Sequence, residues 1–503
     1  MNNIPKPILL AVSIVIIVLV AKSIEVFNYP PLSVHQWRQS DCSSYVKTFY
    51  RTGANVFHPA ALNLLGKQGR MASEFPILYY IAAKVEHIVG EHYWVMRGLN
   101  FLCYVIGLFA LLACVKRWVS DPIYALFPLV LLASSPYYYY YAINFLPNVP
   151  AISFSFVGLY FYLKYDDDSK KRDMILGTLA FALATALKPT DGGILWLAFL
   201  GTWVFLKGYN YVKNAEKTPI LPIFLSTLFI GASIIGWIKY VNWYNDENGN
   251  HQNLIGVYPL WEMTKEAIDY TEVRILELWS NHFQQKHIVT LFKCMAFLYL
   301  VAWWWLDKAL RLITLFLFIG VGIYCVLYYK AFTDHDYYQL IYVVPVVFLI
   351  ITIMEFFDRL VLPHIHPMMK YASYAAMAGV MYVSIIHNRN IQHERYTLPV
   401  FKYTNMNLFT IEPYLRSIGV KPSDIVMSVP DGSPNISLNA MNQYGHTEIF
   451  NDENYNIGNF REMGAAYLIV NDTNYIKQKP IYHPYMKKKV GEYNGIVIYD
   501  IRK

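Results

Sequence analysis

A short polar segment near the N-terminus carries side chains that could support chemistry. Residues 35–41 read His-Gln-Trp-Arg-Gln-Ser-Asp. The Asp41 carboxylate could accept a proton from a hydroxyl group, a step that contributes on the order of 10²–10⁴ in rate. Arg38 offers a planar fork of donors that suits phosphate, and the Trp37 ring could stack on a sugar face. A lone loop aspartate is usually solvated, so these neighbours are what make Asp41 the strongest candidate.

Glu74 lies in the same region and has two interpretations. Glu74-Phe75-Pro76 precedes an amphipathic stretch, Ile77 to Val89, that is too short and too polar to span a bilayer. Both a proline and a carboxylate are favourable near a helix start, so Glu74 could be a structural residue of a helix in the membrane surface. Alternatively it supports the site, or binds a metal with His251 and His282, although no ligand spacing demands this.

Further polar side chains stand at the ends of apolar stretches. Lys188 precedes Pro189 and is either a lysine that extends to the interface or a counter-ion for a lipid phosphate. The segment His335-Asp336-Tyr337-Tyr338 combines interfacial tyrosines with groups that could bind phosphate, sugar hydroxyls or a metal. The tyrosine run 137–141 is typical of an aromatic belt, and the nearby Asn148 could hydrogen-bond a sugar.

The composition indicates that a membrane surrounds these residues. Of the 503 residues, 55% are hydrophobic and 15% are charged, whereas soluble domains carry about 25% charged residues. The 43 Tyr and 12 Trp favour several membrane–water interfaces. The net charge of +7 lies mostly in loops beside apolar segments, so we interpret it as a topology signal and not as a nucleic-acid footprint.

The apolar stretches predict a polytopic α-helical protein with about eleven transmembrane helices. The Lys and Arg residues of alternate loops place the N-terminus in the cytoplasm. An external face then receives loops 28–93 and 241–287 together with Lys188 and His335. The predicted spans lie near 7–27, 94–114, 123–141, 144–163, 174–187, 191–207, 218–240, 288–306, 310–329, 340–356 and 370–387.

The character of the chain changes near residue 389. Residues 1–388 form the predicted transmembrane module, and residues 389–503 a predicted extracytoplasmic α/β domain. Strands are expected at 425–429, 466–470 and 495–499 because these are short apolar runs between turn residues.

Together the motifs resemble one family. Over about residues 5–385 the chain is similar to GT-C fold membrane glycosyltransferases, specifically the dolichyl-phosphate-mannose-protein mannosyltransferase-like family, which includes bacterial aminoarabinose transferases that modify lipid A. In that family an Asp-Glu pair is common where this chain has Asp41-Cys42. A basic residue is missing after Glu74, and Asn148 replaces an acidic residue. The resemblance rests on Trp37 to Asp41, Ser73 to Pro76, Leu146 to Asn148, Lys188-Pro189 and His335 to Leu340.

The resemblance implies a sugar transferase with a polyprenyl-phosphate donor. An acceptor hydroxyl of a glycan, lipid or protein would attack the anomeric carbon with inversion, and Asp41 would take its proton. Arg38, Lys188 and His335 would stabilise the departing lipid phosphate. Trp37, Glu74, Asn148, Asp336, Tyr337 and Tyr338 would support the sugar or acceptor, with no cofactor other than a possible divalent metal. The expected location is a bacterial inner membrane, with the site in the periplasm.

Two other classes remain open from the sequence. A transporter or flippase of lipid-linked glycans would place polar residues at the bilayer midplane and show internal repeats. A non-catalytic partner in glycan assembly would use the external domain for protein contacts. The polar residues instead gather at one predicted face, and no repeat is evident, which favours the enzyme.

Overall fold

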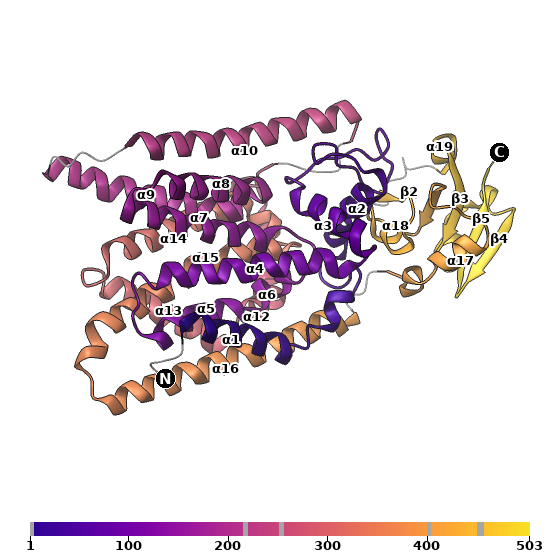
Figure 1. Ribbon diagram of the computed structural model, residues 1–503. Coiled ribbons are helices and arrows are strands. Elements are labelled where there is room, and N and C mark those ends of the chain that lie inside the picture. Colours follow the sequence, from indigo (N-terminus) through magenta and orange to yellow (C-terminus); the bar gives the residue numbers. More distant parts are fainter. Residues whose placement is uncertain (1–4, 215–219, 251–255, 400–403, 450–456, 503) are drawn as a thin grey trace. The chain divides into compact units, whose positions relative to one another are not determined.

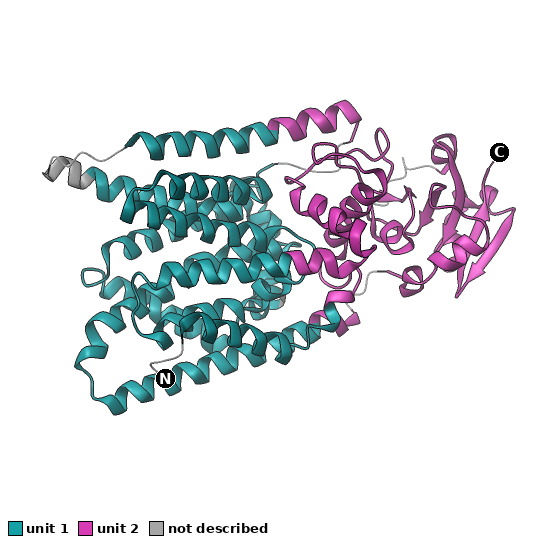
Figure 2. Cartoon of the chain, in the orientation of Figure 1, with its two compact units in different colours: residues 1–26, 100–238, 255–394 teal, residues 27–99, 239–254, 395–503 magenta. Residues whose placement is uncertain are grey.

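The computed structural model describes residues 5–214, 220–250, 256–399, 404–449 and 457–502, which are mostly helical (Figure 1). The chain divides into two compact units, each built from separate segments (Figure 2). Unit 1 comprises residues 1–26, 100–238 and 255–394, and unit 2 comprises residues 27–99, 239–254 and 395–503. The sequence predicted two consecutive domains, whereas here the first polar loop groups with the C-terminal region.

Unit 1 consists of helices, and each predicted span coincides with at least one of them. The stretch 123–141 is divided at Ser134 and Ser135 into two helices, because Pro136 starts a new one. The helices wholly or mainly in this unit are α1 (Lys6–Val20), α4 (Tyr93–Val115), α5 (Pro122–Ala133), α6 (Pro136–Ala142), α7 (Asn148–Asp168), α8 (Lys171–Leu187), α9 (Pro189–Asn214), α10 (Ile220–Asn248), α11 (Lys265–Arg274), α12 (Ser280–Phe283), α13 (Lys286–Val301), α14 (Lys308–Tyr328), α15 (Val343–Phe356) and α16 (Pro367–Thr397).

Five helical segments of the described chain are long and apolar enough to cross a membrane. They are Tyr93–Val115, Pro189–Gly208, Ile220–Asn248, Lys308–Phe332 and Asp336–His364. On α10 many large apolar side chains are exposed, among them Leu221, Phe224 and Leu225. Such a surface is costly in water but suits lipid, where a helix satisfies all of its own backbone groups.

Helices α7, α8 and α9 lie side by side in unit 1 (Figure 1). Their close approach depends on small residues. A Cβ atom on Gly158 of α7 would lie 2.5 Å from the ring of Phe181 on α8. Tyr162 stacks on Phe181 and on Phe199 of α9, with ring centroids 5.4 and 5.3 Å apart. Small residues that let helices approach closely are typical of membrane helix packing.

Unit 2 contains a five-stranded sheet flanked by helices. Its strand order is β2-β1-β3-β5-β4, with β2 and β3 parallel to β1 and with β5 antiparallel to both β3 and β4. Three strands fall where the sequence predicts them, whereas β2 and β4 were not predicted. The strands are β1 (Ile425–Val429), β2 (Gly445–His446), β3 (Ala465–Val470), β4 (Lys489–Tyr493) and β5 (Ile496–Asp500).

Alternating side chains of the strands build two cores, one on each face of the sheet. Val426, Ile469 and Ile498 pack on one face with α17 (Glu412–Ser417) and α18 (Ile436–Met441). Met427, Leu468 and Val497 pack on the other with α19 (Ile457–Glu462) and α20 (Thr473–Lys477).

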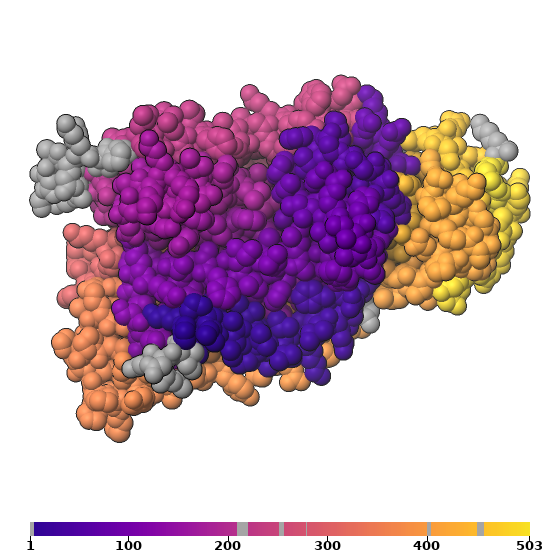
Figure 3. Space-filling view, viewed as in Figure 1, coloured from indigo at the N-terminus to yellow at the C-terminus, as the bar shows by residue number. Residues whose placement is uncertain are grey.

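The polar N-terminal segment of unit 2 contains two helices and is not simply a loop. It contains α2 (Gln36–Thr52) and α3 (Ile77–Val89), which pack on each other, and α2 also contacts α18. In the space-filling view the surface formed by residues near 30–95 adjoins the orange surface of the residues after 400 (Figure 3). The helix predicted at Ile77 to Val89 is confirmed.

Candidate functional site

Helix α2 positions the first group of candidate side chains. His35, in the left-handed conformation with φ 57°, precedes its first residue. Arg38 and Asp41 are three residues apart, which brings them to neighbouring positions on one face of the helix. Trp37 is half-buried beside them. Much of α2 is polar yet buried, Gln39, Ser40 and Ser44 included, so its polar groups need partners within the protein.

Glu74 is the partner of Arg38. Its carboxylate forms an ion pair with the guanidinium, and it accepts hydrogen bonds from the Tyr79 hydroxyl and, at 2.7 Å, from Ser73 Oγ. Burial alone would favour the neutral acid, but Arg38 and these two donors outweigh it and lower the pKa of Glu74 to about 2. Glu74 precedes α3, which starts at Ile77, so its main contacts are with the site and not with the helix terminus.

Arg38 keeps one donor group available. Its Nη2 binds Glu74, whereas Nη1 is buried and has no hydrogen-bond partner in the described part of the chain. A buried guanidinium nitrogen without an acceptor costs free energy. An anionic ligand would supply the missing acceptor, and the planar fork suits phosphate oxygens.

Asp41 is a carboxylate with an unusual environment. The residue is only 7% exposed, and its Oδ1 accepts a hydrogen bond of 2.8 Å from Asn435 Nδ2. Burial raises the pKa of Asp41 to about 7, although Arg38 and Asn435 oppose the shift, and Glu74 and Asp431 add to it. A carboxylate that titrates near neutrality can both accept and release a proton.

Unit 1 holds a second group of candidates around Lys188. This residue separates α8 from α9 in an extended conformation, with φ −157° and ψ 101°. Its Nζ lies over the rings of Tyr338 and Tyr337, 4.6 and 5.7 Å from their centroids. No carboxylate of the described residues lies within ion-pair distance of this ammonium group, so aromatic faces hold a cation that can still bind an anion.

The remaining predicted residues of unit 1 surround this cation. Asn148, the first residue of α7, donates to Asp191 Oδ2 at 2.5 Å and is buried. His335 is exposed, with its ring 5.2 Å from that of Tyr337. Asp336 is fully buried and accepts a hydrogen bond from Tyr141. Lys188, Asn148, Tyr337 and Tyr338 are therefore neighbours, whereas the Asp336 side chain contacts Tyr141.

The metal-site hypothesis finds little support in the contacts of its members. The Glu74 carboxylate already binds the three donors described above, from Arg38, Tyr79 and Ser73. His282 is buried, lies against Tyr137 and Trp279, and has Nε2 3.5 Å from Glu394. His251 lies outside the described residues. Within the described ranges no group of three or more His, Cys, Asp and Glu side chains could hold a metal ion.

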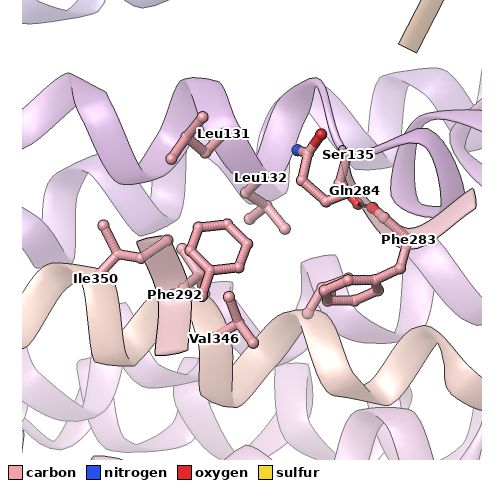
Figure 4. Close-up of a pocket in the computed structure, with 10 residues that line it drawn as sticks. Leu131, Leu132, Ser135, Phe283, Gln284, Phe292, Val346 and Ile350 are labelled. Carbon is pink, nitrogen blue, oxygen red and sulfur yellow. Dashed lines mark hydrogen bonds between the residues drawn. The ribbon is translucent and has the colours of Figure 1, made fainter. Parts of the chain in front are cut away.

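A separate cavity lies among the helices of unit 1 and is mainly apolar (Figure 4). Its polar members are Ser135, which donates to the Phe283 carbonyl at 3.0 Å, and Gln284, which donates to Ser384 at 2.8 Å. None of the predicted site residues lines it. Leu131, Leu132, Phe292, Val346 and Ile350 supply apolar walls.

Sequence reasoning missed four residues that complete these clusters: Tyr79, Asp191, Asn435 and Tyr141. Asp191 follows Lys188 by three residues and could have been found from that spacing. The interpretation of residues 137–141 as an interfacial belt was wrong, because all five tyrosines are fully buried. Their hydroxyls bind internal groups, such as the Trp279 carbonyl for Tyr137 and Ser23 Oγ for Tyr139, both at 2.7 Å.

The fold is that of GT-C membrane glycosyltransferases. A model of the dolichyl-phosphate-mannose-protein mannosyltransferase family matches residues 73–237. Among solved structures, apo ArnT from Cupriavidus metallidurans has 12% sequence identity and a TM-score of 0.62, with 97% of each chain covered. A search of the curated proteins found no match.

Two larger glycosyltransferases share the fold. The arabinofuranosyltransferase AftD from Mycobacteria has 15% identity and a TM-score of 0.52, covering 98% of this chain and 40% of that one. The oligosaccharyltransferase of Archaeoglobus fulgidus has 11% identity and a TM-score of 0.53, covering 98% and 74%. These matches confirm the resemblance predicted from the sequence, and with the apolar helices they identify an integral membrane protein.

Proposed function

We propose that this protein is a glycosyltransferase that moves a sugar from a polyprenyl-phosphate donor to an acceptor hydroxyl. The observation that carries the proposal is the buried Asp41 carboxylate, whose pKa of about 7 suits a general base, on the same helix as Arg38 with its unpartnered Nη1. Two structural neighbours support the donor class: ArnT in a structure bound to undecaprenyl phosphate, and AglB from Archaeoglobus fulgidus in complex with dolichol-phosphate.

In the proposed reaction the acceptor oxygen attacks the anomeric carbon from the face opposite the phosphate. The new carbon–oxygen bond forms as the bond to the phosphate oxygen breaks, so the configuration inverts. Asp41 takes the proton of the acceptor hydroxyl, and the lipid phosphate leaves with the electron pair. Preorganised cations lower this barrier most in a site shielded from water.

We propose phosphate-binding groups for each unit taken by itself. In unit 2, Arg38 is held by Glu74 and would offer Nη1 to an anion. In unit 1, Lys188 would bind an anion through its ammonium group, and the exposed His335 would contribute a hydrogen bond. Glu74 then acts as a supporting residue that orients Arg38.

The sugar and acceptor roles follow from the groups nearby. Within unit 2 the Trp37 ring offers a stacking face. Within unit 1 the Tyr337 and Tyr338 rings do so, Asn148 orients Asp191 beside Lys188, and Asp336 holds the segment that carries the two tyrosines. We propose that the site faces the extracytoplasmic side, with the N-terminus in the cytoplasm, as loop charge predicts.

Replacement of Asp41 by Asn tests the proposal. Because the amide cannot accept the proton, release of polyprenyl phosphate from a panel of lipid-phosphate sugars should fall by roughly 10²–10⁴-fold. Asp472→Asn is the matched control: the exposed Asp472 caps α20 through its side chain, a role that Asn performs as well. Unchanged transfer by Asp41→Asn would exclude the base assignment.

A further inference from the structure

The loop between β1 and α18, residues 430–435, occupies a special position in the sheet of unit 2. It leaves the carboxyl end of β1, whose neighbours β2 and β3 are both parallel to it. The chain goes from β1 to β2 on one side and then returns to β3 on the other, so this loop marks a switch point of the topology. Functional groups of α/β folds concentrate at such points.

Asn435 ends this loop and contacts Asp41 directly. Its Nδ2 donates to Asp41 Oδ1 at 2.8 Å, and its Oδ1 accepts from the Asn63 backbone N–H at 3.0 Å and from Ser44 Oγ at 3.3 Å. A backbone N–H can only donate, so the amide oxygen must face Asn63 and the amide NH₂ must face Asp41. The orientation is thereby fixed, and Asn435 is fully buried.

The loop is itself held in place by its own contacts. Asp431 accepts hydrogen bonds from the backbone N–H groups of Ser433 and Ser437, at 2.9 and 2.8 Å. Asn63 Nδ2 donates to the Pro434 carbonyl at 2.8 Å, and Thr447 Oγ1 donates to the Ser433 carbonyl at 2.6 Å. Asn435 is therefore presented to Asp41 by a braced segment.

We infer that Asn435 is a positioning residue that orients the Asp41 carboxylate and favours its ionised form. This inference rests on the proposed function, in which Asp41 is the base. The hydrogen bond engages Oδ1, whereas Oδ2 receives none from the described residues and is left to accept the proton. The C-terminal region thus contributes to the reaction through the Asn435 amide.

The charges around Asp41 determine the expected pH dependence. Arg38, Cys42 and Tyr45 face it from its own helix, Glu74 from the segment before α3, and Asp431 from the β1–α18 loop. The base works when it is ionised, so kcat/KM should rise with pH and level off above about 7, the pKa of Asp41. Loss of the Asn435 donor raises that pKa and moves the rise to higher pH.

Asn435→Asp is the discriminating variant. It keeps an oxygen for Asn63 and Ser44 but replaces the donor with a second carboxylate oxygen. We expect the acidic limb of kcat/KM to move upward by at least about one pH unit, with a loss of about fivefold at pH 7 that recovers near pH 9. Should this variant not fold, Asn435→Ala removes the donor without adding charge and should shift the limb in the same direction.

Asn407→Asp is the control, since Asn407 donates to the Asn494 carbonyl at 3.0 Å and is hydrogen-bonded neither to Asp41 nor to residues 430–435. The acidic limb of the kcat/KM profile of this control variant should match that of the wild-type protein. If Asp41→Asn is inactive, either of two outcomes would overturn the inference. One is an acidic limb that does not shift in the Asn435 variants. The other is an equal loss of kcat/KM at all pH values in both Asn→Asp variants. If Asp41→Asn retains transfer, it is the proposed function that fails.

Discussion

Two carboxylates in the same cluster of unit 2 have opposite environments. Glu74 is paired with Arg38 and has its pKa lowered to about 2, whereas the buried Asp41 has its pKa raised to about 7. Such divergence separates a group that stays charged from a group that exchanges protons. The sequence could rank Asp41 above Glu74 only by its neighbours Trp37 and Arg38 and by family resemblance, because pairing and burial are not visible in a motif.

Lys188 allows a test of donor binding at the level of one side chain. Lys188→Gln removes the cation over Tyr337 and Tyr338, so affinity for polyprenyl phosphate should fall about tenfold. The melting temperature should change little, because a partly exposed cation–π contact contributes about 0.5–1 kcal/mol. Binding can be measured by titration of the purified protein with the lipid phosphate.

Lys370→Gln is the matched control for this experiment. Lys370 lies 5.6 Å from the ring centroid of Tyr374 in the same unit and pairs with Asp121, so it resembles Lys188 except for its bound carboxylate. An equal loss of affinity in both variants would show that the effect of Lys188 is not specific.

At the scale of elements, the packing of α7 against α8 depends on Gly158. In Gly158→Ala the new methyl group would meet the Phe181 ring at 2.5 Å. The helices must separate or the ring must move, which should destabilise the protein by about 1–3 kcal/mol. Thermal unfolding in detergent measures this change.

Gly231→Ala provides the comparison, because a Cβ atom there meets no atom within 4 Å. This substitution in α10 should be neutral or stabilising by up to about 1 kcal/mol, since Ala favours helix more than Gly does. If both variants lose the same stability, close α7–α8 packing is not the cause.

The helices were the part of the structure that the sequence predicted best. Apolar length located the helices of unit 1, five of which are long and apolar enough to span a membrane, and alternation of turn residues with apolar runs located β1, β3 and β5. β2 was missed because only Gly445 and His446 form it, and β4 because Lys489 to Tyr493 is largely polar. The buried tyrosines were misread because their hydroxyls find partners far along the chain, which no local pattern reveals.

At the scale of the whole molecule, residues 27–99 and residues 395–503 belong to the same compact unit. Consecutive domains were predicted because composition changes near residue 389, but composition does not report which segments pack together. Asn435 was missed for the same reason, as it lies 394 residues after Asp41.

The metal requirement is also a property of the whole protein. We propose that transfer needs no divalent ion, because the Glu74 oxygens already accept from Arg38, Tyr79 and Ser73. Incubation with EDTA should therefore leave the rate of phosphate release within about twofold of its original value. A loss of activity that added Zn²⁺ or Mg²⁺ restores would contradict this expectation.

The contact between Asn435 and Asp41 also bears on biosynthesis. The ribosome completes every predicted membrane-spanning segment before it reaches residue 435, so during most of translation the base lacks the amide that orients it. A prematurely terminated chain would insert into the bilayer yet carry an incompletely assembled site. We expect such truncated products to consume little lipid-linked sugar, which would spare a donor that the cell must regenerate.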